Sequence, residues 1–152
     1  DRLQFQELDW KLENDPDNEE LLDEYIVLLN RYLDSGIAEA NDMDIKLRAY
    51  SDMLERKLKK APDRLPLWKE KVNTDIRIRE YEAAEEEIQY ILEKWDKNEA
   101  GYLLMLRYYS ATQSRRGIDR VIEKIRRKNI HLTPQGRREI GFWMKEEDVE
   151  EL

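Results

Sequence analysis

Apolar residues recur every three or four positions along most of the chain, which is the spacing of one face of an α-helix. Short polar breaks interrupt this pattern, and each contains Pro, Gly, Asn, Asp or Ser, the residues that form turns and begin or end helices. No segment alternates apolar and polar residues as a half-buried strand does. With only 5 Gly and 4 Pro in 152 residues, helix formers dominate between the breaks, and the sequence predicts an all-α fold.

The breaks divide the chain into about eight helical segments. The clearest start is Thr133, an N-cap residue that is followed by Pro134 at the first helical position. The clearest amphipathic segment is 117–129, because its Ile and Val residues form one stripe and most of its Arg and Lys residues lie off that stripe. The predicted helices span residues 2–14, 18–34, 42–60, 65–78, 81–95, 99–112, 117–129 and 134–147.

An internal period of 34 residues relates the segments that follow residue 65. The earlier segments align only with an offset of 46 residues, because a longer connection and a longer helix intervene. Short helices with short connections and a repeat predict an α-solenoid, in which stacked antiparallel helix pairs bury one another's apolar faces. The pairs at the 34-residue offset are Trp68 and Tyr102, Val72 and Leu106, Ala84 and Ile118, Ile88 and Ile122, and Ile91 and Ile125.

A helix–turn–helix unit of this length resembles the tetratricopeptide repeat. Trp68 stands at the aromatic position of the first helix, Tyr81 at the aromatic position of the turn, and Ala84 at the small packing position. The chain departs from the family pattern where Val72 replaces a Gly and Asp96 replaces the closing Pro. Degenerate repeats of this kind also resemble the half-a-tetratricopeptide repeats of RNA-processing scaffolds. The resemblance implies a superhelix of helix pairs.

The resemblance covers about residues 19–147 and implies one helical-repeat domain over residues 1–152. Another α-solenoid and a non-repeat helical bundle are the alternative architectures. The outer sides of the two terminal helices lack a neighbour, so we expect capping by the acidic tail, continuation in a larger protein, or self-association through the terminal helices. The implied units are about 19–64, 65–98 and 99–132, with flanking helices 2–14 and 134–147.

The resemblance also implies a concave groove lined by the first helix of each pair. In chaperone-binding members this groove holds a carboxylate clamp, but Leu104 stands where the second Asn of the clamp is needed. We therefore expect a looser groove for an acidic or mixed peptide, and the alternative is a solvated helix face without a ligand. The candidate partner-binding residues are Lys69, Asn73, Arg77, Arg107 and Arg138.

Charge is distributed unevenly along the chain. The net charge is −8, yet residues 107–138 contain 10 Arg or Lys and only 2 acidic residues. Cations near a helix C-terminus complement the helix dipole, which is one explanation of this basic block. The alternatives are an anionic protein or lipid surface and, less favoured, nucleic acid, because the acidic remainder repels phosphates. The cations on the outward side of segment 117–129 are Arg120, Lys124, Arg127 and Lys128, and Arg116 lies just before the segment on the same side.

The sequence offers little catalytic or metal-binding chemistry. There is no Cys, and the one His, His131, lies in an inter-helix loop without a nucleophile pattern. Asp15, Asp17 and Glu19 alternate like the start of a calcium loop, but Glu20 stands at the position that requires Gly. These carboxylates suit the N-terminal region of a helix better. We expect no enzyme activity, no cofactor and no metal.

No apolar run approaches the roughly 18 residues that a membrane-spanning helix needs, so we expect no membrane span. The compartment stays open: a soluble chain without Cys suits the cytoplasm or, if a signal segment was removed, an extracytoplasmic compartment. The expected function is a non-catalytic protein–protein interaction scaffold that binds a peptide or partner protein in the groove. The alternative is a helical scaffold that associates with nucleic acid or another anionic surface through residues 107–138.

Overall fold

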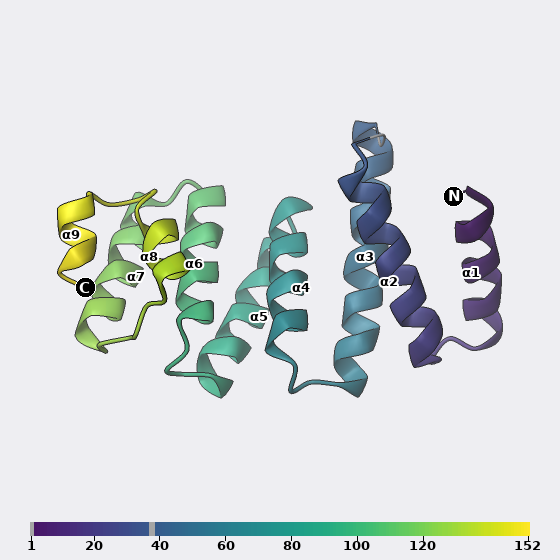
Figure 1. Ribbon diagram of the computed structural model, residues 1–152, viewed down its shortest axis with the longest axis horizontal. Helices are drawn as coiled ribbons and strands as arrows, with labels where there is room; N and C mark the ends of the chain where they lie inside the picture. The colour runs from purple at the N-terminus through teal and green to yellow at the C-terminus, as the bar shows by residue number, and fades with distance from the viewer. Residues whose placement is uncertain (1, 37–38) are drawn as a thin grey trace. The chain divides into compact units, whose positions relative to one another are not determined.

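A computed structural model describes residues 2–36 and 39–152 of the chain. Every regular element in these residues is an α-helix, so the all-α prediction is confirmed (Figure 1). The helices of a unit pack mainly against their neighbours along the chain. The helices are α1 (Arg2–Asn14), α2 (Glu19–Asp34), α3 (Ala40–Lys60), α4 (Leu65–Arg77), α5 (Tyr81–Lys94), α6 (Glu99–Ala111), α7 (Arg115–Arg127), α8 (Pro134–Ile140) and α9 (Glu146–Glu150).

The predicted ranges of the first seven helices agree with α1–α7 to within two residues at each end. The prediction of a single helix over 134–147 is wrong, because α8 ends at Ile140 and α9 begins after a separate turn. Gly141 is the C-cap of α8, and Phe142 N–H donates to Glu139 O at 3.1 Å in the turn that follows. Gly has a poor helix propensity, and here it ends a helix that the apolar pattern alone continues.

The chain divides into two compact units, unit 1 (Asp1–Arg79) and unit 2 (Glu80–Leu152). The sequence-based repeat 65–98 includes residues of both units, so its helix pairing stays a prediction. In unit 1 the packing order is α1 on α2, α2 on α3, and α3 on α4. In unit 2 the central helix is α6, which packs against α5, α7 and α8.

The core of unit 1 forms where the apolar faces of its first three helices meet. The ammonium of Lys46 covers the outer side of this core, 3.8 Å from the centre of the Phe5 ring. This cation–π contact suits a charged residue that must lie against an aromatic surface at the edge of a core. The buried residues of the cluster are Phe5, Leu8, Leu12, Leu22, Tyr25, Leu28, Leu29, Tyr50, Met53 and Leu54.

Two glycines allow α7 and α8 to approach α6 closely in unit 2. A Cβ on Gly117 would lie 2.3 Å from Cδ1 of Tyr109, so only Gly permits α7 to lie this close to the Tyr109 ring. A Cβ on Gly136 would lie 2.3 Å from Oε1 of Glu99. That carboxylate accepts hydrogen bonds from the Thr133 N–H at 2.7 Å and the Thr133 hydroxyl at 2.8 Å, which fixes the start of α8 against α6.

Several helix termini are stabilised locally, by side-chain N-caps at their starts and by left-handed residues in the turns at their ends. The predicted N-cap Thr133 is confirmed, since its side chain accepts from Gly136 N–H, and Asn18 caps α2 in the acidic segment that resembles a calcium loop. The turns after α4 and α6 place Arg79 and Gln113 at φ 62° and 58°, in the left-handed region. These two residues are 34 positions apart, so the period found in the apolar residues recurs in the backbone.

Candidate partner-binding surface

The exposed face of α7 carries four positive side chains at spacings of four, four and three residues, which places them on one side of the helix. In the part of the chain that the structure describes, none of them forms an ion pair or hydrogen bond. Together with Asp119 and Glu123 they line a shallow hollow of about 630 Å³ on the helix surface. We call them the α7 stripe, and its members are Arg116, Arg120, Lys124 and Arg127.

The opposite face of α7 fixes this orientation. Ile118, Val121 and Ile125 are buried, and α7 packs on α6 through this side. The apolar stripe and the cations lie on different sides of one helix, as the sequence predicts for segment 117–129. Because the apolar side of α7 packs on α6, the α7 stripe lies on the surface, where a partner can contact it.

The two acidic residues of α7 engage basic residues outside the stripe. Asp119 pairs with Arg115 at 3.2 Å, and Glu123 pairs with Arg126 at 3.3 Å. Such exposed pairs contribute about 0–1 kcal/mol each to stability. Both carboxylates also line the hollow, where the four cations of the stripe outnumber them, so the charge of this surface is positive but partly offset.

Three of the predicted groove residues lie on α4 in unit 1. Lys69 and Arg77 are exposed, and neither makes an ion pair or hydrogen bond among residues 2–36 and 39–152. Asn73 is half-buried between them on the same side of the helix. The other two predicted residues lie in unit 2, so the groove as a whole stays a prediction.

The predicted groove residue Arg107 has a partner on another helix. Its Nη2 donates to Oε2 of Glu139 on α8 at 2.9 Å, and its Nε donates to Oε1 of the same carboxylate. A bidentate arginine–carboxylate contact of this kind is both stronger and more specific in geometry than a single hydrogen bond. Arg107 therefore joins α6 to α8, and a peptide carboxylate would have to compete with Glu139 for it.

The remaining predicted residue, Arg138, is exposed on α8. It lines a hollow of about 460 Å³ at the α8–α9 turn, together with Phe142 and Val149. The Phe142 side chain is 83% exposed, and Arg137 on the far side of the hollow donates to Val149 O at 3.0 Å. Acidic residues of α9 also line the hollow, so its charge is mixed.

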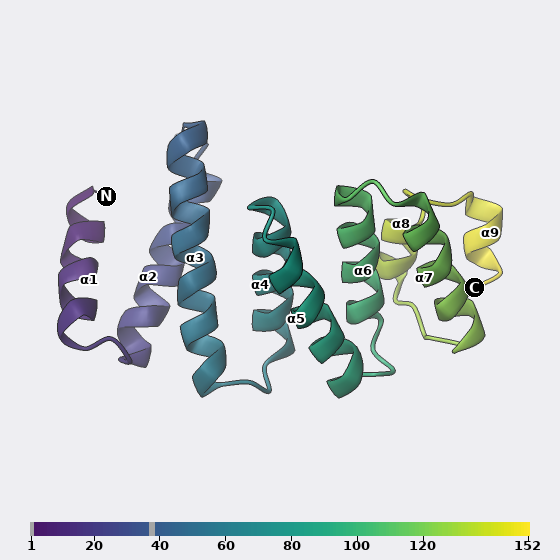
Figure 2. The same cartoon turned by 180° about the vertical axis from the view of Figure 1, so that it is seen from behind.

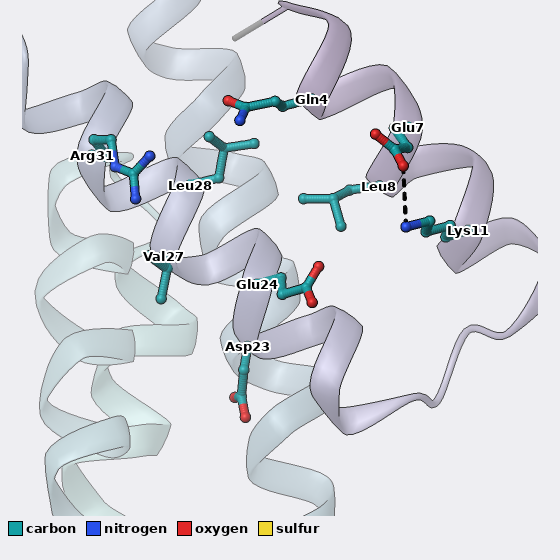
Figure 3. Close-up of a pocket in the computed structure, with 9 residues that line it drawn as sticks. All are labelled: Gln4, Glu7, Leu8, Lys11, Asp23, Glu24, Val27, Leu28 and Arg31. Atoms are coloured by element: carbon teal, nitrogen blue, oxygen red, sulfur yellow. Dashed lines mark ion pairs between the residues drawn. The ribbon is translucent and has the colours of Figure 1, made fainter.

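A further hollow of about 480 Å³ lies between α1 and α2 (Figure 3). Its apolar part consists of Leu8, Leu28 and the exposed Val27, and Figure 3 shows Leu8 projecting from α1 into the space beside α2. Glu7 and Lys11 form an ion pair at 3.2 Å on its rim. Residues of both signs line the rest, and the hollow therefore selects no particular charge.

The buried polar side chains form internal contacts rather than an open site. Asp75 is 1% exposed and accepts hydrogen bonds from Ser51 Oγ at 2.6 Å and Lys71 Nζ at 2.5 Å. The Tyr50 hydroxyl accepts from Asn30 Nδ2 at 3.1 Å and donates to Glu70 Oε2 at 2.9 Å. Burial, more than the Glu70 charge, raises the pKa of Tyr50 to about 12. These groups join α2, α3 and α4 of unit 1.

Among the described residues, no group of three or more His, Asp or Glu side chains converges as metal ligands. His131 is exposed in the loop between α7 and α8. None of the helices between residues 2 and 152 that the structure describes combines the length and apolar character needed to cross a bilayer.

Comparisons with protein-family models, with curated proteins and with solved structures gave no match to this chain. The resemblance to tetratricopeptide repeats therefore stays a prediction, and the functional argument depends on the surface chemistry of the molecule itself.

Sequence reasoning found the α7 stripe, because cations at spacings of three and four residues on an amphipathic helix are visible without a structure. It missed the Arg107–Glu139 pair, which joins residues 32 positions apart on different helices. It also missed the hollow between α1 and α2, because the exposed Val27 differs in no sequence feature from the buried apolar residues around it.

Proposed function

We propose that this chain is a non-catalytic interaction module that binds an acidic segment of a partner protein. The α7 stripe is the observation that carries the proposal. A chain with a net charge of −8 repels most anions, so a helix surface where four cations without an ion-pair partner among the described residues outnumber two carboxylates is a local attraction for negative groups. Cations 6 Å apart, about one helical turn, suit carboxylates with the same spacing on a partner helix.

An acidic protein segment is favoured over nucleic acid for two reasons. Unit 2 contains 13 Lys or Arg and 16 Asp or Glu residues, a net charge of −3, so a phosphate backbone extending beyond α7 would meet repulsion. The stripe also contains no aromatic side chain on which a base could stack. A short acidic segment avoids both difficulties because it needs to cover only the stripe.

The proposal is tested by fluorescence anisotropy with a labelled poly-glutamate peptide and, in parallel, a single-stranded poly-uridine RNA. We expect the peptide to bind, with an affinity that falls as ionic strength rises. The double variant Arg120→Glu/Arg127→Glu should weaken peptide binding at least tenfold, about 1.4 kcal/mol. The matched control is Lys69→Glu/Arg77→Glu, which makes the same charge change on exposed positions of α4.

The control separates the remaining explanations. Equal losses from the two double variants would indicate bulk electrostatic attraction and contradict a site on α7. A larger loss from the α4 variant would move the site to the predicted groove. Tighter binding of the RNA than of the peptide would replace the acidic-protein proposal with the nucleic-acid alternative.

A further inference from the structure

The outer face of α5 carries carboxylates at the positions where the outer face of α7 carries guanidinium groups. Both helices bury equivalent apolar residues, which are Ala84, Ile88 and Ile91 in α5 and Ile118, Ile122 and Ile125 in α7. The exposed positions follow the same 34-residue offset but invert the charge. The equivalent pairs are Glu82 and Arg116, Glu86 and Arg120, and Glu93 and Arg127.

We call Glu82, Glu86 and Glu93 the α5 stripe. All three are exposed, and no cation pairs with any of them in the described part of the chain. Glu85, which lies between them in sequence, is different, because it accepts a hydrogen bond from the Tyr108 hydroxyl at 3.2 Å. The side chains of the α5 stripe thus resemble those of the α7 stripe in having no ion-pair partner among the described residues.

The two stripes belong to one face of unit 2. Helices α5 and α7 both pack against α6, and Figure 2 shows both on the near side of this unit, with α8 behind α7. Short connections before and after α6 reverse the chain twice, so α5 and α7 run in the same direction. The face therefore presents an acidic helix and a basic helix that are parallel to one another.

We propose that the partner is a second copy of this chain, bound face to face through α5 and α7. The inference depends on the proposed function, because it names the occupant of the α7 stripe. A two-fold axis that runs along the helices places the α7 stripe of each copy opposite the α5 stripe of the other. A two-fold axis across the helices would instead bring like charges together, so the charge pattern selects the first arrangement.

The register supports this arrangement. The paired helices are parallel across such an axis, and the intervals of four and seven residues are the same in both stripes. A two-fold axis along the helices opposes residues at the same height. Equivalent positions at one height then form three pairs, Arg116 with Glu82, Arg120 with Glu86 and Arg127 with Glu93, and the symmetry repeats them. The same alignment brings Asp119 opposite Glu85. Asp119 is paired with Arg115, but the Tyr108 hydroxyl that bonds Glu85 is neutral, so this like-charge contact opposes the association and the three pairs of opposite charge outnumber it.

The strength of the association follows from the kind of contact. Ion pairs between exposed side chains are individually weak and are screened by salt. We therefore expect a reversible dimer at low ionic strength that dissociates as salt is added. A partner that bound through the α7 stripe alone would leave the α5 stripe without a role, whereas a second copy uses both.

The experiment is sedimentation velocity on the full chain and on two charge-reversed variants. The acidic variant carries Arg116→Glu, Arg120→Glu and Arg127→Glu, and the basic variant carries Glu82→Arg, Glu86→Arg and Glu93→Arg. Each variant alone should self-associate at least tenfold more weakly than the parent chain, because its own stripes repel. An equimolar mixture of the two should form a heterodimer, since every opposed pair is again of opposite sign.

A chain that carries all six reversals should regain the parent's self-association, which no external acidic partner explains. If circular dichroism shows that a triple variant has lost helix content, the smaller exchange of Arg120→Glu and Glu86→Arg gives the same test. Failure of the mixture to associate would overturn the inference. A parent chain that binds poly-glutamate but stays monomeric at low salt would overturn the dimer alone. A parent chain that neither binds poly-glutamate nor self-associates would overturn the proposed function too.

Discussion

The contact between Gly117 and the Tyr109 ring determines how closely α7 approaches α6, and it allows a quantitative test. A Cβ on residue 117 would lie 2.3 Å from Cδ1 and 2.4 Å from Cγ of Tyr109. Non-bonded carbon atoms are most stable about 3.5–4.0 Å apart. The substitution Gly117→Ala therefore forces either the ring or the helix to move by about 1.1–1.7 Å, the difference between these distances.

Two effects of opposite sign contribute to the free energy of unfolding. Ala is up to about 1 kcal/mol more favourable than Gly inside a helix. Overpacking of a tight contact costs about 1–3 kcal/mol. Gly117→Ala should therefore destabilise the parent chain by about 0–3 kcal/mol, the difference of the two effects. In a Tyr109→Ala background the clash is absent, and the same substitution should stabilise by up to about 1 kcal/mol.

The assay is urea denaturation followed by far-UV circular dichroism on the parent, both single variants and the double variant. This double-mutant cycle isolates the coupling between the two positions, which we expect to be about 1–3 kcal/mol. If the two units unfold in separate transitions, only one transition should shift. An effect of Gly117→Ala with the same sign and size in both backgrounds would refute the argument that the ring and the helix are in tight contact.

Two further predictions concern the buried polar groups of unit 1. Asp75→Ala should lower the free energy of unfolding by about 3–5 kcal/mol, because it leaves the buried Lys71 without its carboxylate, whereas Lys71→Met/Asp75→Leu should recover most of this loss in the same urea assay. Tyr50, whose pKa is raised from 10.0 to about 12, stays protonated in the folded chain after the unfolded chain ionises. Its contribution to stability should be complete below pH 10 and be lost between pH 10 and about 12, by about 1.4 kcal/mol per pH unit. Alkaline urea titrations of the parent and Tyr50→Phe check this, and identical pH dependence in the two would contradict it.

The elements that the sequence predicts well are those determined by local interactions. The helix at Thr133 begins where predicted, because the N-cap bond to Gly136 and the position of Pro134 involve only neighbouring residues. The end of that helix was missed, because apolar residues continue at helical spacing beyond Gly141. The chain turns there, and Arg137 then bonds Val149 O, a contact across 12 residues that no local pattern indicates.

The candidate site divides in the same way. The α7 stripe is a property of one helix, so its residues were predictable from spacing alone. The predicted groove residues depend on packing between helices, and one of them, Arg107, is held by a carboxylate on α8. The charge inversion between α5 and α7 lies in the sequence at the same 34-residue offset as the apolar repeat. It becomes meaningful only when the structure shows that these positions are exposed and have no ion-pair partner within residues 2–36 and 39–152.

The attachment of Thr133 to Glu99 has a consequence for the order in which unit 2 folds. The larger contacts of the unit, α5 with α6 and α6 with α7, join helices that are adjacent in the chain, and such short-range contacts form rapidly because little loop entropy is lost. Helix α8 is an exception, since the carboxylate that receives its N-terminal hydrogen bonds belongs to α6, 34 residues earlier. It has only seven residues and is too short to persist alone. Its amides should therefore gain protection from hydrogen exchange only after α6 has formed, and should be among the first in the unit to lose it.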